Sequence, residues 1–192
     1  MRWRVTVARM HPRLSRRTIH EGRVVRLYVD RVALPNGVEA ELEFVEHPGA
    51  AAVVPLHADG SITLIRQYRY AAGGFILEAP AGKLESGEAP GTCAARELVE
   101  EAGLRAGRLH PLGVILTTPG FTDERIHLFA ATDLVPAPQA LEHDEILELV
   151  RLPLAQALEL VARGDITDGK TLCALMRTEQ ELRANRLAPG AG

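Results

Sequence analysis

One short segment, GKLESGEAPGTCAARELVEEAGL at residues 82–104, gathers most of the side chains suited to chemistry. Glu97, Glu100 and Glu101 stand three and four residues apart, so on a helix their carboxylates project from one edge. The predicted helix carries a single base, Arg96, and the three carboxylates repel one another unless cations lie between them. Carboxylate oxygens suit Mg²⁺, which usually keeps water or phosphate oxygens as its other ligands. This helix edge is therefore a candidate metal site.

A solvated acidic helix face is the alternative interpretation, but the spacing favours a specific motif. The segment follows the pattern Gly, five residues, Glu, seven residues, Arg-Glu, aliphatic, any, Glu-Glu, any, Gly, aliphatic. The residues that carry the pattern are Gly82, Glu88, Arg96, Glu97, Leu98, Glu100, Glu101, Gly103 and Leu104. This pattern is the Nudix box, and the chain resembles the Nudix hydrolases. The match is far more specific than a lone glycine-rich loop.

The resemblance implies an α/β (α+β) fold, the Nudix fold, in which a mixed β-sheet lies between helices. It implies hydrolysis of a nucleoside diphosphate linked to another group, with Mg²⁺ as cofactor and Mn²⁺ as a substitute. The implied metal ligands are Glu97, Glu101, Glu100 and the backbone carbonyl of Ala81. Arg96 would hold a carboxylate of the box in orientation. A bound metal ion neutralises diphosphate charge and acidifies a water molecule.

Residues beside the box resemble the ADP-ribose pyrophosphatase branch of the family. The segment EAPAGKLE leads into the box, and Pro119 in TTPGFTDE is the fifteenth residue after Leu104. A plain Pro-Gly turn between two strands is the alternative for this proline. The implied reaction converts ADP-ribose to AMP and ribose 5-phosphate. The implied substrate contacts are Arg66, Tyr68, Glu78, Pro119, Gly120 and Phe121.

Two other functions stay open at the level of the sequence. Hydrolysis of another nucleoside diphosphate sugar, such as GDP-mannose or ADP-glucose, would depend on pocket residues that the sequence does not locate. The other function is that of a non-catalytic regulator with the Nudix fold, which binds such ligands without cutting them. Regulators of this kind typically have an eroded box, whereas this box is complete. The sequence therefore favours an enzyme.

A general base is expected outside the box, because metal ions would occupy the box carboxylates. A loop that closes over the substrate is a suitable place for it. The segment ALEHDEILE at residues 140–148 contains several acidic residues, and related pyrophosphatases use a glutamate from this segment. Counted back from Ile146, Glu142 is the best match and Glu145 the next, while His143 is interpreted as a surface residue. The catalytic candidates are Glu142, Glu145, Glu100 and Arg96.

The segment IRQYRY at residues 65–70 predicts a strand rich in cationic side chains and aromatic rings. Alternation along a strand places Arg66, Tyr68 and Tyr70 on one face, and Gln67 and Arg69 on the other. The resemblance places Arg66 near the phosphates or the terminal ribose. For Arg69, a phosphate contact and a solvated strand edge are both open.

The elements that position these groups follow from hydrophobic patterns. Residues 18–45 alternate apolar and polar side chains around a Pro-Asn-Gly turn, which predicts an antiparallel β meander. Further strands are predicted at residues 50–56, 61–70, 73–82, 109–118, 124–134 and 145–153, and helices at residues 90–102, 154–164 and 171–187. Pro90 and Gly103 are the start and stop signals of the box helix.

These elements predict four parts of the chain. They are a basic tail at residues 1–17, the meander at 18–46, a Nudix hydrolase domain at 47–186 and a flexible tail at 187–192. A sheet as small as the meander cannot stand alone. It resembles the dimerisation sheet of the ADP-ribose pyrophosphatases, so a homodimer is expected. Tyr28 or Phe44 in this sheet stacks on adenine or packs in a core, and the sequence leaves both open.

Composition limits the class of protein and its partners. A length of 192 residues with 46% hydrophobic and 24% charged residues predicts a soluble globular protein. A net charge of -3 gives no case for nucleic acid or membrane as a partner, and no run of apolar residues is long enough to span a bilayer. Cys93 and Cys173 fit neither a disulfide framework nor a zinc site, which favours the reducing cytoplasm. The basic start lacks the apolar region of a secretory signal.

Overall fold

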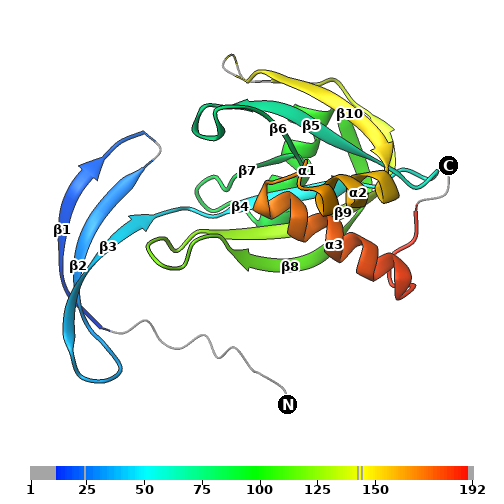
Figure 1. Ribbon diagram of the computed structural model, residues 1–192. Helices are drawn as coiled ribbons and strands as arrows, with labels where there is room; N and C mark the ends of the chain where they lie inside the picture. The colour runs from blue at the N-terminus through cyan, green and yellow to red at the C-terminus, as the bar shows by residue number, and fades with distance from the viewer. Residues whose placement is uncertain (1–11, 24, 142, 144, 190–192) are drawn as a thin grey trace. The chain divides into compact units, whose positions relative to one another are not determined.

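The computed structural model describes residues 12–23, 25–141, 143 and 145–189. These residues form two compact units (Figure 1). The amino-terminal unit contains the described residues up to His47 and the loop Thr118–Glu124. The main unit contains Pro48–Thr117 and the described residues from Arg125 onward. The loop therefore belongs to the amino-terminal unit, although the strands on either side of it lie in the main unit.

The amino-terminal unit is a three-stranded antiparallel sheet in the order β1-β2-β3. Its strands are β1 (Arg13–Glu21), β2 (Arg26–Ala33) and β3 (Glu39–Glu46). The predicted meander is confirmed, but β1 begins at Arg13, inside the segment predicted to be a basic tail. This part of β1 lacks the alternation of apolar and polar side chains on which the prediction was based. Charged contacts hold it in the sheet instead.

Arg16 makes those charged contacts. Its guanidinium forms two hydrogen bonds of 2.7 Å with the carboxylate of Asp30 and a third of 3.3 Å with Glu46. The hydrogen bonds from Arg16 hold the pKa of Asp30 below its usual value. The same guanidinium lies over the rings of Tyr28 and Phe44, 4.0 and 5.2 Å from their centroids. Both rings therefore pack against Arg16 inside this unit.

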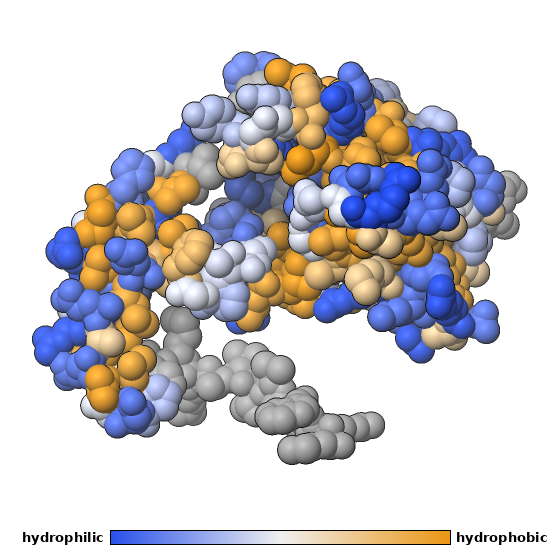
Figure 2. All heavy atoms as spheres, viewed as in Figure 1, coloured by the Kyte–Doolittle hydropathy of each residue, from blue (hydrophilic) through white to orange (hydrophobic). Residues whose placement is uncertain are grey.

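Apolar side chains of the sheet remain open to solvent, and they are visible on the surface of this unit in Figure 2. Large apolar side chains in the strands or next to them are 43% to 53% exposed, namely Leu14, Ile19, Val25, Val38 and Leu42. In the described part of this unit, no helix packs on the sheet. A sheet that covers so little of its apolar surface is poorly suited to stand alone.

The main unit contains two sheets. The larger is mixed, with the order β7-β4-β9-β8 and a parallel pair β4 and β9. Its strands are β4 (Ala50–Pro55), β7 (Ala81–Lys83), β8 (Leu104–Leu116) and β9 (Arg125–Pro136). The smaller is antiparallel, with the order β10-β5-β6, and its strands are β5 (Ser61–Arg69), β6 (Gly74–Glu78) and β10 (Leu147–Pro153). A short 3-10 helix, η1 (Tyr70–Ala72), joins β5 to β6, so Tyr70 lies just outside the strand predicted to contain it.

Helices cover the mixed sheet on both faces, which confirms the predicted fold class. They are α1 (Pro90–Ala102), α2 (Leu154–Arg163) and α3 (Gly169–Arg183). Ala51 and Val53 of β4 pack in one cluster with Leu98 of α1, whereas Ala52 and Val54 lie in the other with residues of α3. Burial on both faces explains why β4 reads as a continuous apolar run. Among the described helices, none has the length and apolar character needed to cross a membrane.

The core of the main unit extends to Leu187. This side chain is 5% exposed and belongs to the larger core cluster. Its backbone N–H donates to the carbonyl of Glu181 at 3.2 Å. The predicted flexible tail therefore starts too early, because an apolar side chain just beyond α3 folds back onto the core.

Candidate active site

Helix α1 carries the carboxylates into the edge of the core. Pro90 begins the helix, where a missing N–H does no harm, and Gly103 ends it in the left-handed conformation with φ of 62°. Leu98 packs on the mixed sheet, and burial extends around the helix to Glu97 and Glu101, which are 8% and 2% exposed. Two carboxylates are thus held at the boundary of the core instead of in solvent.

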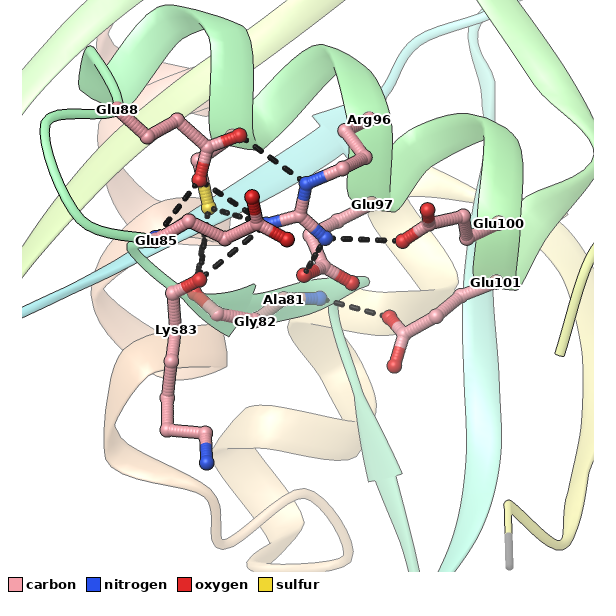
Figure 3. A network of polar contacts seen from close by, with 10 residues as sticks. Ala81, Gly82, Lys83, Glu85, Glu88, Arg96, Glu97, Glu100 and Glu101 are labelled. Carbon is pink, nitrogen blue, oxygen red and sulfur yellow. Dashed lines mark hydrogen bonds and ion pairs between the residues drawn. The ribbon is translucent and has the colours of Figure 1, made fainter. Parts of the chain in front are cut away.

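The guanidinium of Arg96 holds three carboxylates in place (Figure 3). Its Nε and Nη2 donate to the two oxygens of Glu88 at 3.0 and 3.1 Å. Its Nη1 donates to Glu97 at 2.6 Å and to Glu100 at 2.9 Å, and its Nη2 also donates to the carbonyl of Lys83 at 3.2 Å. The hydrogen bonds from Arg96 lower the pKa of Glu88 to about 2. Glu88 therefore stays ionised at neutral pH.

Strand β7 brings backbone against the same helix edge. The N–H of Ala81 donates to Oε2 of Glu101 at 2.8 Å (Figure 3). Gly82 lies so close to Glu97 that a Cβ at this position would overlap the carboxylate. Only glycine allows this approach of the strand to the side chain. Strand β7 and the acidic edge of α1 therefore form one site.

Glu97 and Glu101 are the two inner carboxylates of the site, and burial leaves their charge without enough compensation. It raises the pKa of Glu97, and it raises the pKa of Glu101 to about 8. Repulsion adds to both shifts, from Glu100 and Glu145 on Glu97, and from Glu97 and Glu145 on Glu101. Hydrogen bonds to the carboxylates oppose these shifts without cancelling them. A cation among the carboxylates would relieve both the burial of charge and the repulsion.

The donor set fits a hard divalent cation such as Mg²⁺, because it offers carboxylate oxygens and a nearby backbone carbonyl. In the described part of the chain, no three His, Cys, Asp or Glu side chains already converge as ligands. Glu97 and Glu100 turn towards Arg96, and Glu101 turns towards the N–H of Ala81 (Figure 3). Each of these three hydrogen bonds engages one oxygen of its carboxylate, so a cation would bind through the other oxygen while the bond is kept.

Another buried carboxylate, Glu78, lies at the end of β6. It is 2% exposed and pairs with Arg69 at 2.7 Å and with Lys170 at 3.2 Å. Arg69 is thus ion-paired with a buried acid, while its own side chain stays 40% exposed. Its positive charge acts on Glu101. Lys170, at the start of α3, is a charged residue of this region that the sequence analysis missed.

Arg66 and Tyr68 project from β5 on the face opposite to Arg69. The guanidinium of Arg66 lies 4.2 Å from the ring centroid of Phe75 and pairs with Glu148 at 3.3 Å. Tyr68 meets the same ring edge-on, with centroids 5.6 Å apart. Of the two arginines, Arg69 is the one whose charge acts on a carboxylate of α1.

The other predicted substrate contacts lie in the amino-terminal unit. Pro119, Gly120 and Phe121 belong to the loop Thr118–Glu124, where the carbonyl of Phe121 accepts a hydrogen bond of 2.7 Å from the N–H of Val45. The side chain of Phe121 is 51% exposed. These three residues remain predicted contacts.

The two candidate bases, Glu142 and Glu145, precede β10 in the sequence. Glu142 lies outside the described residues. Glu145 lies within them, and its charge raises the pKa of both Glu97 and Glu101. Glu145 is thus within electrostatic reach of the inner carboxylates, although the count from Ile146 favours Glu142.

The chain resembles known proteins over most of its length. The NUDIX domain family matches residues 46–175, which include the whole motif at residues 82–104. An ADP-ribose pyrophosphatase of Bacillus subtilis (strain 168) is 38% identical over 177 residues, 90% of this chain and 96% of that protein. A methanol dehydrogenase activator of Bacillus methanolicus is 43% identical over 159 residues, 82% of this chain and 86% of that protein. A GDP-mannose pyrophosphatase of Yersinia pestis (strain Pestoides F) is 33% identical over 150 residues, 73% and 75% of the two chains.

A solved structure resembles this chain along most of its length. The crystal structure of an ADP compounds hydrolase matches with a TM-score of 0.79 and 26% sequence identity. The match covers 91% of this chain and 95% of that chain. The fold described above is therefore shared along nearly the full length of both.

Replacing Gly82 by Ala tests the close approach of β7 to α1. The added methyl group displaces the Glu97 carboxylate, and a displacement near 1 Å can reduce a rate by about 10²-fold. We expect kcat/KM for a nucleoside diphosphate sugar to fall by about that factor, measured in steady-state kinetics. Gly91→Ala is the matched control, because a Cβ at Gly91 meets nothing within 4 Å. Equal activity in the two variants would contradict the described geometry.

The raised pKa of Glu101 predicts a pH-dependent stability of the metal-free protein. Between about 4.5 and about 8, the folded chain keeps a proton on Glu101 that the unfolded chain has lost. The folded state therefore binds more protons, and the free energy of unfolding falls as pH rises through this window. In EDTA, we expect a higher Tm at pH 6 than at pH 8, and a smaller difference in Glu101→Gln. Identical differences in the two proteins would show that Glu101 is not the group responsible.

Proposed function

The chain belongs to the NUDIX domain family, which matches more than half of its 192 residues, and we propose that it hydrolyses ADP-ribose to AMP and ribose 5-phosphate. The observation that carries this proposal is the pair of buried carboxylates, Glu97 and Glu101, on the edge of α1. Their raised pKa values mark a site that a divalent cation would stabilise. The relatives named ADP-ribose pyrophosphatase and ADP compounds hydrolase support the choice of substrate.

The residues that would hold Mg²⁺ are Glu97, Glu101, Glu100 and the carbonyl of Ala81. When bound, Mg²⁺ or Mn²⁺ neutralises diphosphate charge and acidifies a water molecule for attack on phosphorus. Arg96 fixes the side chains of Glu97 and Glu100 through its two Nη1 hydrogen bonds. The carboxylates thereby keep their positions while substrate and cation enter.

Arg69 is the arginine that we assign to the diphosphate. Glu78, which also pairs with Lys170, holds its guanidinium, and the charge of Arg69 already acts on Glu101. A diphosphate bound beside Glu101 would lie in the same field. Glu78 then contributes to substrate binding through Arg69. Arg66, Tyr68, Pro119, Gly120 and Phe121 stay assigned to the remainder of the substrate.

A glutamate before β10 would remove the proton from the attacking water. Glu145 is supported by its electrostatic effect on both inner carboxylates. Glu142 is supported by its distance in sequence from Ile146. A carboxylate in this role must reach the water by a hydrogen bond, directly or through one further water.

Two alternatives have specific support among the relatives. The GDP-mannose pyrophosphatase, 33% identical, favours another nucleoside diphosphate sugar as substrate. The methanol dehydrogenase activator, 43% identical, favours activation of a methanol dehydrogenase as a second function. A rise in the turnover of purified methanol dehydrogenase on addition of this protein and Mg²⁺ would support the second function, and unchanged turnover would reject it.

We assign the amino-terminal sheet to a homodimer interface. The exposed apolar side chains of this sheet support the assignment, since they need a cover that the described part of the unit does not provide. A cytoplasmic location accords with two free cysteines, of which Cys93 is buried. The proposed partners are a small-molecule substrate and a second copy of the chain, with no role for nucleic acid or membrane.

ADP-ribose hydrolysis should depend strictly on a divalent cation. We expect AMP and ribose 5-phosphate as products with Mg²⁺ or Mn²⁺, and loss of turnover in excess EDTA, because the inner carboxylates would lack their counter-ion. The measurement is phosphate release after coupling to a phosphatase, with ADP-ribose, GDP-mannose and ADP-glucose compared. Undiminished turnover in EDTA would rule out the metal mechanism. A kcat/KM for GDP-mannose about tenfold or more above that for ADP-ribose would reassign the substrate.

Substitutions to Gln separate metal ligands from the general base. Glu101→Gln removes the charge that holds the cation, so we expect both activity and Mn²⁺ binding to be lost. For the residue that acts as base, the change to Gln should lower kcat by about 10²–10⁴-fold and leave Mn²⁺ binding intact. Comparing kcat of Glu142→Gln and Glu145→Gln identifies which of the two acts. Full kcat in both variants would place the base within the box.

The homodimer assignment is open to a direct test. We expect sedimentation velocity at micromolar concentration to show a dimer. Leu42→Asp should shift the protein towards monomer, because it places a charge on an apolar side chain that is 46% exposed. Met176→Asp, on α3 and 53% exposed, is the control and should remain dimeric. A monomeric wild-type protein would remove the assignment.

A further inference from the structure

The three-residue segment Ala79–Ala81, which runs from the end of β6 into the first residue of β7, is held by three separate elements. The N–H of Ala79 donates to Oγ1 of Thr171 on α3 at 2.8 Å. The carbonyl of Pro80 accepts from the N–H of Val53 on β4 at 2.9 Å. The N–H of Ala81 donates to Glu101 on α1 at 2.8 Å. These bonds together determine the direction of the peptide groups that lead to the Ala81 carbonyl.

Of these three bonds, the bond from Ala79 to Oγ1 of Thr171 is the one whose side-chain partner lies outside residues 82–104. Its hydroxyl donates to Oδ2 of Asp168 at 2.6 Å, which leaves the lone pairs of Oγ1 free to accept from Ala79. The same Asp168 oxygen accepts from the backbone N–H of Thr171 at 3.0 Å and caps α3. Thr171 and Ala79 are both fully buried. The hydroxyl is therefore fixed in direction and shielded from water.

Charged side chains reinforce this link between α3 and β6. Lys170 donates to Asp168 at 3.0 Å and pairs with Glu78 at 3.2 Å. Glu78 in turn binds Arg69. The four groups carry two positive and two negative charges, and all but Arg69 have side chains less than 20% exposed. The start of α3 is thus tied to the end of β6 by both backbone and side-chain bonds.

We propose that Thr171 is a positioning residue for metal binding: its hydroxyl sets the Ala79–Ala81 backbone so that the Ala81 carbonyl and Glu101 face one cation. The inference rests on the proposed function, which makes these two groups metal ligands. Without the hydroxyl, the buried N–H of Ala79 has no acceptor, and the segment must shift to find one. The shift moves the carbonyl of Ala81 and the N–H that orients Glu101.

The test compares Thr171→Val, which keeps the shape but removes the hydroxyl, with Thr171→Ser, which keeps the hydroxyl. The matched control is Thr178→Val, since Thr178 is also fully buried on α3 and its hydroxyl donates to the Ala174 carbonyl of the same helix. Mn²⁺ binding to each protein, without substrate, is measured by electron paramagnetic resonance. Tm is recorded for each variant to compare their folding.

We expect Thr171→Val to weaken Mn²⁺ binding by about 10–100-fold, the usual effect of removing a residue that orients a metal ligand. Thr171→Ser should bind Mn²⁺ like the wild type, and so should Thr178→Val even if its Tm falls equally. If Thr171→Val does not fold, Thr171→Ala removes the same hydroxyl without the added methyl group and replaces it in the comparison.

Two contrary results are distinguishable. Wild-type binding of Mn²⁺ with equal binding by the folded Thr171 variants would overturn the role of Thr171 and leave the metal site standing. Failure of the wild-type protein itself to bind Mn²⁺ would overturn the proposed metal site, and the role of Thr171 with it.

Discussion

The site depends on one interaction, the contact of the Arg96 guanidinium with Glu88, Glu97 and Glu100. Concentrated negative charge at the edge of a core opposes folding, and a single guanidinium with several donors compensates part of it in a fixed geometry. The compensation is incomplete, because Glu101 lies beyond the reach of these bonds and keeps a raised pKa. The uncompensated cost of ionising Glu101 is the reason we propose a cation at this site. The same arginine therefore compensates Glu88, Glu97 and Glu100 and leaves Glu101 without a guanidinium partner in these bonds.

The rest of the main unit holds backbone and side chains around that charged edge. The mixed sheet supports α1 on one face and α3 on the other, so groups from both helices meet where β6 passes into β7. Gly82 allows the backbone to approach Glu97, and Thr171 fixes the approach from the far side. Under the proposed function, small shifts in either contact would move the proposed ligand atoms by distances that matter for catalysis.

The amino-terminal unit is stabilised in a different way. Its centre is a cation, Arg16, paired with Asp30 and stacked on two aromatic rings, and its apolar side chains remain largely open. An isolated sheet of this kind gains little from burial. Its stability should therefore depend on association, which is why we link this unit to a second copy of the chain.

The sequence by itself determined α1 and the acidic edge, because helical geometry alone brings Glu97, Glu100 and Glu101 together and the contacts of Arg96 lie within a few residues along the chain. Hydrophobic patterns also predicted the strands and helices of the main unit, whereas the mixed sheet between helices followed from the resemblance to the Nudix hydrolases. Only the tertiary structure decided that Arg69 pairs with Glu78 and Lys170, and that Thr171 bonds to Ala79 across 92 residues. It also decided that a basic segment forms β1, because Arg16 finds Asp30 on the neighbouring strand. Such pairings depend on which segments the folded core brings side by side, and local patterns carry no record of that.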